Sequence, residues 1–152
     1  MKRVLIVLLI LTILPFTRLA AQNQNNMEKL NAYRIAFFTR RMNLTPREAE
    51  KFWPVYNEFQ DKKNSIQQER IALNRNVNQN ELKMSEKELI EAGDKFIALQ
   101  VQEAALAQEF HNKFKEILAP GKVIRLYQAE NQYRMMLLNE LKDRKPVRNN
   151  PR

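Results

Sequence analysis

Few side chains in this sequence could act as catalysts. Glu48 and Glu50 could suggest a general acid/base pair, and His111 is the only histidine. Residues two positions apart on a helix point to different faces, however, and no carboxylate lies in helical register with His111. There is also no cysteine nucleophile and no glycine-rich phosphate loop. We therefore predict that the protein is not an enzyme, with no catalytic residues and no cofactor.

A metal site on a single helix needs histidine or carboxylate ligands three or four residues apart, so that both point the same way. The neighbours of His111 at those spacings are not such ligands: Ala107, Gln108, Phe114 and Lys115. The sequence predicts no metal site within one chain. A zinc or nickel site would need ligands from a partner subunit.

The elements that must position these side chains are expected to be helices. The chain has only two glycines and almost no alternation of β-branched residues. We predict an all-α fold of four helices in an extended, hairpin-like arrangement with long central helices. The first helix is expected over residues 27–42, and the fourth should end near Leu141.

The two central helices are outlined by their apolar residues. The second carries them at seven-residue intervals, which is typical of the narrow seam of a coiled coil: Phe52, Phe59, Ile66 and Leu73. The third carries them mostly at three- and four-residue steps: Leu89, Ala92, Phe96, Leu99, Leu106, Phe110, Phe114 and Ile117. Five asparagines or glutamines surround Val77 and compete with helical hydrogen bonding, which predicts a turn between these helices over residues 74–85.

Capping residues mark where the central helices begin. Thr45 is followed by Pro46, which suits the first helical position, and by Glu48, which completes a capping box. Ser85 and Glu88 form a second box. Pro54, directly after the only tryptophan, is then expected to bend one continuous helix and not to start a new one.

The sequence resembles itself when it is shifted by 74 residues. The shift aligns Leu44 with Leu118 and Pro46 with Pro120, and it also aligns four later pairs: Phe52 with Leu126, Trp53 with Tyr127, Asn57 with Asn131 and Phe59 with Tyr133. Both leucine–proline junctions come just before a helix start. We infer two related helix-turn-helix units.

The first 21 residues are typical of a cleaved secretory signal peptide. Lys2 and Arg3 precede the apolar run "VLIVLLILTIL", and the small pair Ala20–Ala21 follows. The thirteen residues of 4–16 are fewer than the roughly 20 needed to cross a bilayer. We predict export to the periplasm, a helical domain over residues 22–142, and a disordered basic tail over residues 143–152. Loss of Lys2, Arg3 and Arg18 would lower the formal net charge from +9 to +6.

The junction "LTPRE" resembles the LTxxQ motif of the Spy/CpxP family of periplasmic proteins, with Glu48 in the glutamine position. The second motif would lie at "LAPGK", which keeps Leu118 but places Ala119 and Lys122 where the motif has threonine and glutamine. The resemblance covers residues 27–141. It implies two motifs at helix junctions of a hairpin-shaped protomer, and protomers that pair into a curved antiparallel homodimer.

The resemblance implies two classes of function. Some members are ATP-independent chaperones that hold unfolded or misfolded proteins on a basic, partly apolar surface, and other relatives are envelope-stress accessories or metal sensors bound to one dedicated partner such as a sensor protein. The basic charge and the methionines favour the chaperone class, and export makes nucleic acid an unsuitable partner. The first client contacts that we predict are Arg40, Arg41 and Met42, whereas Lys62 and Lys63 are expected to be solvated.

Overall fold

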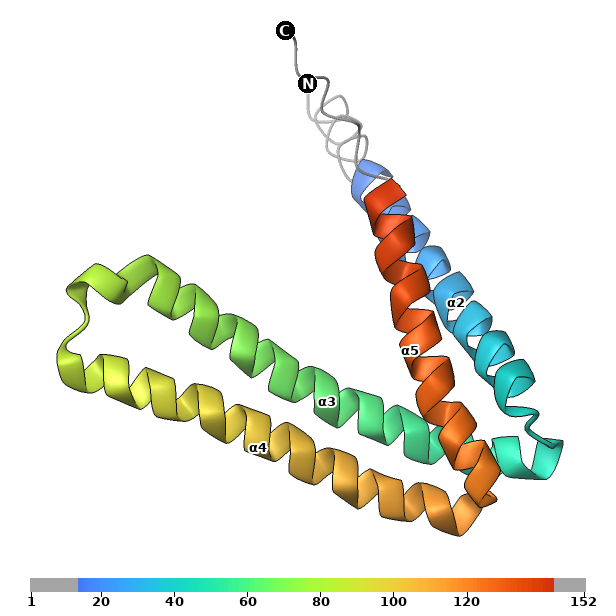
Figure 1. The fold of residues 1–152 in the computed structure, drawn as a ribbon. Helices are drawn as coiled ribbons and strands as arrows, with labels where there is room; N and C mark the ends of the chain where they lie inside the picture. Colours follow the sequence, from blue (N-terminus) through green and yellow to red (C-terminus); the bar gives the residue numbers. More distant parts are fainter. Residues whose placement is uncertain (1–13, 144–152) are drawn as a thin grey trace, which may run out of the picture. The chain divides into compact units, whose positions relative to one another are not determined.

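A computed structural model describes the backbone of residues 14–143 and the side chains of residues 28–143. These residues form four α-helices and one short 3₁₀ helix, without strands: α2 (Leu14–Met42), α3 (Pro46–Asn80), η1 (Glu81–Lys83), α4 (Glu86–Ile117) and α5 (Pro120–Asp143) (Figure 1). The all-α prediction with long central helices is confirmed. Within residues 14–143, no helix has both the length and the apolar character that crossing a membrane requires.

Helix α2 is longer than the sequence predicted. It begins at Leu14 and not near Met27, so our predicted start of this helix was about thirteen residues too late. Pro15 sits in the first turn, where its missing N–H costs no helical hydrogen bond. No glycine or further proline interrupts the segment before Met42. The predicted signal peptide lies partly outside the described residues, as does nearly all of the predicted tail.

Helices α3 and α4 pack side by side as an antiparallel hairpin (Figure 1). Our predicted turn over residues 74–85 was placed too early, because residues 74–80 still belong to α3. The amides of Asn74 and Asn80 donate to the backbone carbonyls four residues before them, at 3.0 Å each. These side chains therefore hydrogen-bond within the helix instead of ending it, and the reversal falls at η1 and at the capping box of Ser85.

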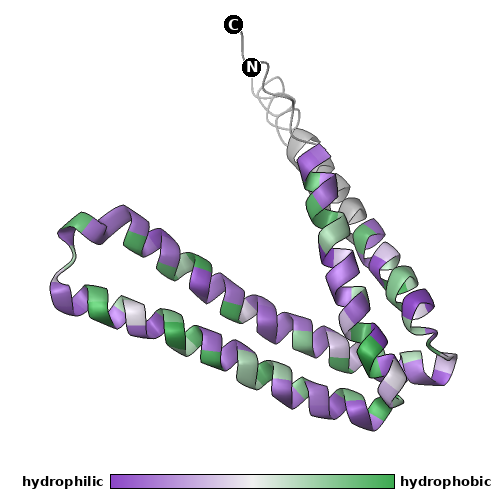
Figure 2. Ribbon diagram, viewed as in Figure 1, coloured by the Kyte–Doolittle hydropathy of each residue, from purple (hydrophilic) through white to green (hydrophobic). Residues whose placement is uncertain are grey.

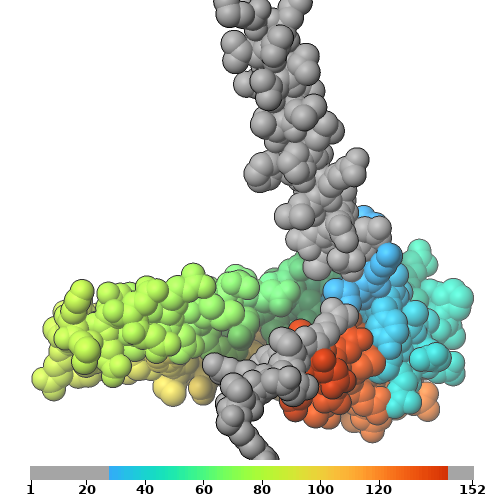
Figure 3. Space-filling view, turned by 90° about the horizontal axis from the view of Figure 1, so that it is seen from above, coloured from blue at the N-terminus to red at the C-terminus, as the bar shows by residue number. Residues whose placement is uncertain are grey.

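The hairpin core follows the predicted seven-residue seam. Phe52, Phe59 and Ile66 of α3 are buried, and α4 supplies buried residues that meet them: Ala92, Leu99, Leu106, Phe110 and Phe114. The buried rings lie in the half of the hairpin nearer the junctions, and the ring centroids of Phe59 and Phe110 are 5.2 Å apart. Figure 2 shows the apolar residues spaced along both helices between polar ones. Figure 3 shows the α3 side as a continuous band of side chains.

Pro54 lies inside α3, which runs unbroken from Pro46 to Asn80. The prediction of one continuous helix is confirmed, whereas the bend remains a prediction. A proline in a helix interior removes a hydrogen bond and costs about 3 kcal/mol. The rings of Phe52, Trp53 and Tyr56 pack around this turn, with centroids between 5.1 and 5.8 Å apart, and their burial offsets that cost.

The contacts divide the chain into two compact units, one of residues 1–43 and 126–152 and one of residues 44–125. The first unit pairs α2 with most of α5. Tyr133 of α5 packs against Phe37 and Phe38 of α2 with ring centroids 5.7 Å away from each, and the Tyr33 hydroxyl donates to Met136 Sδ at 3.2 Å. Each unit therefore combines one helix from each of the two predicted repeats.

Candidate functional site at the two helix junctions

The first junction is built by Leu44, Thr45, Pro46 and Glu48. Asn43 just before it has a positive φ of 51°, which asparagine tolerates better than most residues. Leu44 is buried, and Thr45 then caps α3 through the predicted box. The Thr45 hydroxyl accepts from the Glu48 amide at 3.3 Å, while Glu48 Oε2 accepts from the Thr45 amide at 2.8 Å. The geometry of this motif agrees with the sequence prediction.

The second junction keeps the buried leucine but has no side-chain cap. Leu118 ends α4 in an extended conformation and is 3% exposed. Pro120 starts α5, and the backbone carbonyl of Ala119 accepts from the amides of Lys122 and Val123 at 2.8 and 3.2 Å. The methyl group of Ala119 cannot accept a hydrogen bond. The junctions therefore share the leucine and the proline and differ in the polar residues.

The two residues that replace the motif glutamines bind each other. Lys122 Nζ lies 2.6 Å from Glu48 Oε2, and their side chains are only 18% and 23% exposed. This ion pair joins the first turn of α3 to the first turn of α5. The 74-residue shift aligns Glu48 with Lys122. The opposite charges of these two residues are the signal in the sequence that could have revealed the contact. From the sequence, we interpreted Lys122 only as a departure from the motif.

The electrostatics of Glu48 follow from this contact. The hydrogen bond from Lys122 is the largest cause that lowers the pKa of Glu48 from 4.5 to about 2, followed by the bond from the Thr45 backbone amide. Partial desolvation of the carboxylate acts in the opposite direction. Glu48 is therefore ionised at neutral pH, where its carboxylate accepts hydrogen bonds from Thr45 and Lys122.

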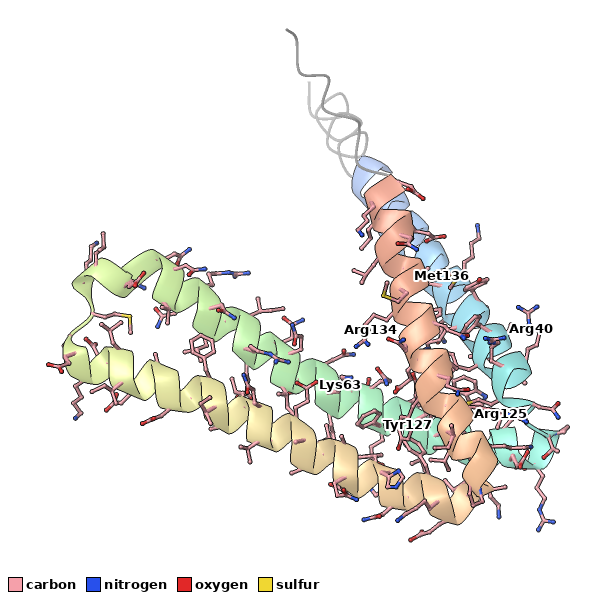
Figure 4. All side chains as sticks on the ribbon, viewed as in Figure 1. Arg40, Lys63, Arg125, Tyr127, Arg134 and Met136 are labelled. Atoms are coloured by element: carbon pink, nitrogen blue, oxygen red, sulfur yellow. The ribbon has the colours of Figure 1, made fainter. Side chains whose placement is uncertain are left out.

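The predicted client contacts have different environments. Arg40 is exposed on α2 and points away from α5 (Figure 4). Arg41 donates a hydrogen bond to Gln132 Oε1 of α5. Met42 is fully buried, so our prediction of a client contact at Met42 was wrong, because its position at the end of α2 places its side chain in the core. Of the three, Arg40 and Arg41 are exposed and Met42 is not.

Lys62 and Lys63 were expected to be solvated, and their side chains are 48% and 40% exposed, but both ammonium groups also lie near aromatic rings. Lys62 Nζ lies 5.3 Å from the centroid of the Phe110 ring, and Lys63 Nζ lies 5.8 Å from that of Phe59. Lys113 Nζ is closer still to Phe110, at 4.1 Å. Lys62 also pairs with Glu58 at 2.8 Å. These ammonium groups lie over aromatic rings at the border of the core, where a positive charge interacts favourably with the ring face.

His111 is half-buried on α4. In the part of the chain that the structure describes, no three histidine, aspartate or glutamate side chains come together as a metal site would require. No protein family, curated protein or solved structure was found to match this chain. The resemblance of its junctions to the LTxxQ motif therefore rests on the residues named above.

Proposed function

We propose that this protein is an ATP-independent, chaperone-like envelope-stress protein that holds unfolded or misfolded clients on a basic, partly apolar helical surface. The proposal is supported mainly by large apolar side chains that the helices leave exposed beside basic ones. Monomeric proteins seldom expose extended apolar surface unless it binds something. We assign client binding to a surface on α5. Met42 is buried and is therefore no longer proposed as a client contact.

The outer face of α5 is defined here as Tyr127, Asn131, Arg134, Met135 and Leu138. Tyr127, Asn131, Met135 and Leu138 follow one another at three- and four-residue steps, and Arg134 lies three residues after Asn131, so all five lie along one side of the helix. Tyr127, Met135 and Leu138 are 41%, 49% and 46% exposed. Arg134 of the same face (Figure 4) donates a hydrogen bond to Asn131 Oδ1 at 2.8 Å. An aromatic ring, a flexible thioether and a leucine next to an arginine can pack against many different apolar segments.

The charge of the chain supports the same function. Its net charge of +9, or +6 without the predicted signal peptide, attracts acidic segments over a distance before apolar contact is made. The proposed location is the periplasm, because residues 1–21 are typical of an export signal. The proposed partners are unfolded proteins and a second copy of the chain, and we do not propose nucleic acid as a partner.

The test is an aggregation assay on the purified chain from residue 22, with several unrelated denatured proteins and without ATP. We expect light scattering to be suppressed for all of them at near-stoichiometric amounts. The double substitution Met135→Ser and Leu138→Ser should weaken suppression for every client. Ile71→Ser is the matched control, because Ile71 is also exposed, at 39%, but lies on α3. Full activity of the α5 variant would contradict the client surface proposed here.

The same assay addresses the alternative, a periplasmic sensor or regulator module that binds one dedicated partner. Such a module would leave unrelated clients to aggregate, and that result would overturn the chaperone proposal. Salt provides a second measurement. At 0.5 M salt the screening length falls to about 4 Å, so association with an acidic client should slow more than dissociation quickens. The substitution Arg40→Gln should reproduce part of the slower association.

A further inference from the structure

The positive charge of the chain belongs to only one of its two units. Residues 44–125 hold thirteen basic and thirteen acidic residues, so this unit is formally neutral. Without the predicted signal peptide, the other unit consists of residues 22–43 and 126–152 and holds ten basic and four acidic residues. The net charge of +6 therefore lies entirely in this second unit, and a partner that is recognised by charge should bind there.

The last turns of α5 carry positive charge and exposed apolar side chains on the same side. Leu138 and Leu141 are 46% and 60% exposed. Three- and four-residue steps place two cations beside these leucines, whereas a helix of 3.6 residues per turn directs Glu140 and Asp143 away from Leu138. We call this side the α5 terminal face, and it consists of four exposed residues: Arg134, Leu138, Leu141 and Lys142.

The sequence that follows this face is strongly basic. Residues 144–152 contain four basic and no acidic residues: Arg144, Lys145, Arg148 and Arg152. Their structure lies outside the described residues, but the first of them is joined directly to the end of α5 at Asp143 (Figure 1). Clusters of about four to eight lysines and arginines next to an amphipathic helix are typical of segments that bind anionic lipid headgroups.

We propose that the α5 terminal face and the basic segment of residues 144–152 bind an anionic lipid surface. Leu138 and Leu141 enter the headgroup region, and the cations beside and after them pair with the lipid phosphates. Neither contribution is sufficient alone, because two leucines bury little apolar area and the attraction of exposed charges is screened by salt. Two weak contributions together give a stable but reversible attachment. The helix lies on the membrane surface and does not cross it.

A lipid surface matches this face better than other acidic partners do. A polyanion such as nucleic acid would use the cations and would give no reason for the exposure of Leu141. An acidic protein would need an apolar patch framed by carboxylates, whereas every anionic membrane has phosphates above an apolar layer. The proposal goes beyond the holding of clients, because it assigns the protein a place at the membrane.

The test is flotation of the purified chain with lipid vesicles. The chain should start at residue 22, because the apolar run within residues 4–16 would itself bind lipid. We expect binding to vesicles of equal parts phosphatidylglycerol and phosphatidylcholine, and none to phosphatidylcholine alone. At 0.5 M salt, where the screening length is about 4 Å, binding to the anionic vesicles should fall strongly. Equal binding to both kinds of vesicle, or no binding to either, would overturn the proposal.

A pair of charge variants tests the position of the site. Lys142→Gln with Lys145→Gln removes two cations, each of which strengthens binding to an anionic surface roughly fivefold, so the affinity should fall roughly tenfold or more. Lys83→Gln with Lys87→Gln is the matched control, because it removes the same charge from exposed positions of the neutral unit. Equal losses for the two double variants would mean that only the net charge matters, and would overturn the proposal.

A pair of leucine variants tests the apolar contribution. Leu141→Ser should weaken binding to the anionic vesicles severalfold, whereas Leu82→Ser should not, although Leu82 of η1 is fully exposed as well. Circular dichroism should show unchanged helix content for both, because both side chains are exposed. If Leu141→Ser binds as tightly as the unsubstituted chain, or if soluble heparin binds more tightly than the vesicles, the site is one for a polyanion and the proposal fails.

The vesicle experiments and the aggregation assay can fail separately. None of these variants changes Met135 or Leu138, so suppression of aggregation should persist where vesicle binding is lost. A chain that binds no vesicles would overturn the membrane site and leave the proposed function as it stands. A chain that binds vesicles but leaves clients to aggregate would do the reverse.

Discussion

The two helix junctions have the same apolar framework and different polar chemistry. At the first junction, Leu44 is buried and Thr45 and Glu48 satisfy each other's backbone amides. At the second, Leu118 is buried but Ala119 provides no side-chain acceptor, and Lys122 turns instead to Glu48. The comparison indicates that the leucine and the proline define the junction, whereas the polar positions can be exchanged if their partners change with them.

The largest expected change in stability comes from replacing the buried leucine that both junctions share. Leu44→Ala and Leu118→Ala should each lower the free energy of unfolding by about 2–5 kcal/mol, the usual cost of a leucine cavity. Leu118, which is more deeply buried, should cost at least as much as Leu44. Urea titrations followed by circular dichroism would measure both. A loss below about 1 kcal/mol at one junction only would show that the leucines are not equivalent.

A smaller change in stability is expected from removing the side-chain cap that only the first junction has. Thr45→Ala removes the side-chain cap of α3 and should lower stability by roughly 0.5–2 kcal/mol, measured in the same titrations. Thr45→Ser keeps the hydroxyl and serves as the control, with little change expected. Stability of Thr45→Ala equal to that of Thr45→Ser would mean that the capping box contributes nothing.

The ion pair between the junctions should appear as a pH dependence. The pKa of Glu48 is lowered from 4.5 to about 2 in the folded protein, so its stabilisation is complete above about pH 4.5 and is lost as the pH falls toward 2. Lys122→Met removes the main cause of the shift, so the pKa of Glu48 should rise toward its usual value.

Thermal midpoints measured between pH 6 and pH 2 should therefore fall less steeply for Lys122→Met than for the unsubstituted chain. Other carboxylates with lowered pKa values, such as Glu58, Glu88 and Glu109, contribute equally to both proteins. Parallel curves for the two proteins would show that the contact with Lys122 does not stabilise the fold.

The smallest effect asks whether the second junction can be made like the first. Ala119→Thr offers a hydroxyl to the backbone amide of Lys122, but the reciprocal carboxylate of a capping box is missing. Stability should stay equal or rise by at most about 1 kcal/mol, as measured by thermal melts with Ala119→Val as the control for the added volume. A clear loss of stability would mean that the two junctions differ in backbone geometry as well as in side chains.

Local patterns predicted the helices well and their contacts poorly. The boxes at Thr45 and Ser85 and the seam of Phe52, Phe59 and Ile66 are found where the sequence placed them, because capping and seven-residue periodicity depend on near neighbours. The early turn was wrong because Asn74 and Asn80 bond to the carbonyls of their own helix. The burial of Met42 and the pair of Glu48 with Lys122 depend on residues distant in sequence, which no local pattern contains.

The pairing of helices in the two units has a consequence for the order of folding. Helices α3 and α4 are joined by a short reversal, so the hairpin is held by contacts that are close in sequence near its tip. In the other unit Tyr33 and Met136 are 103 positions apart, and closing so long a loop is slow unless intervening structure shortens it. We expect the hairpin to form first and to bring α2 and α5 together. Stopped-flow fluorescence of Trp53, the only tryptophan, would follow the hairpin, and a Trp53 signal that lags behind that of a dye pair attached to α2 and α5 would reverse this order.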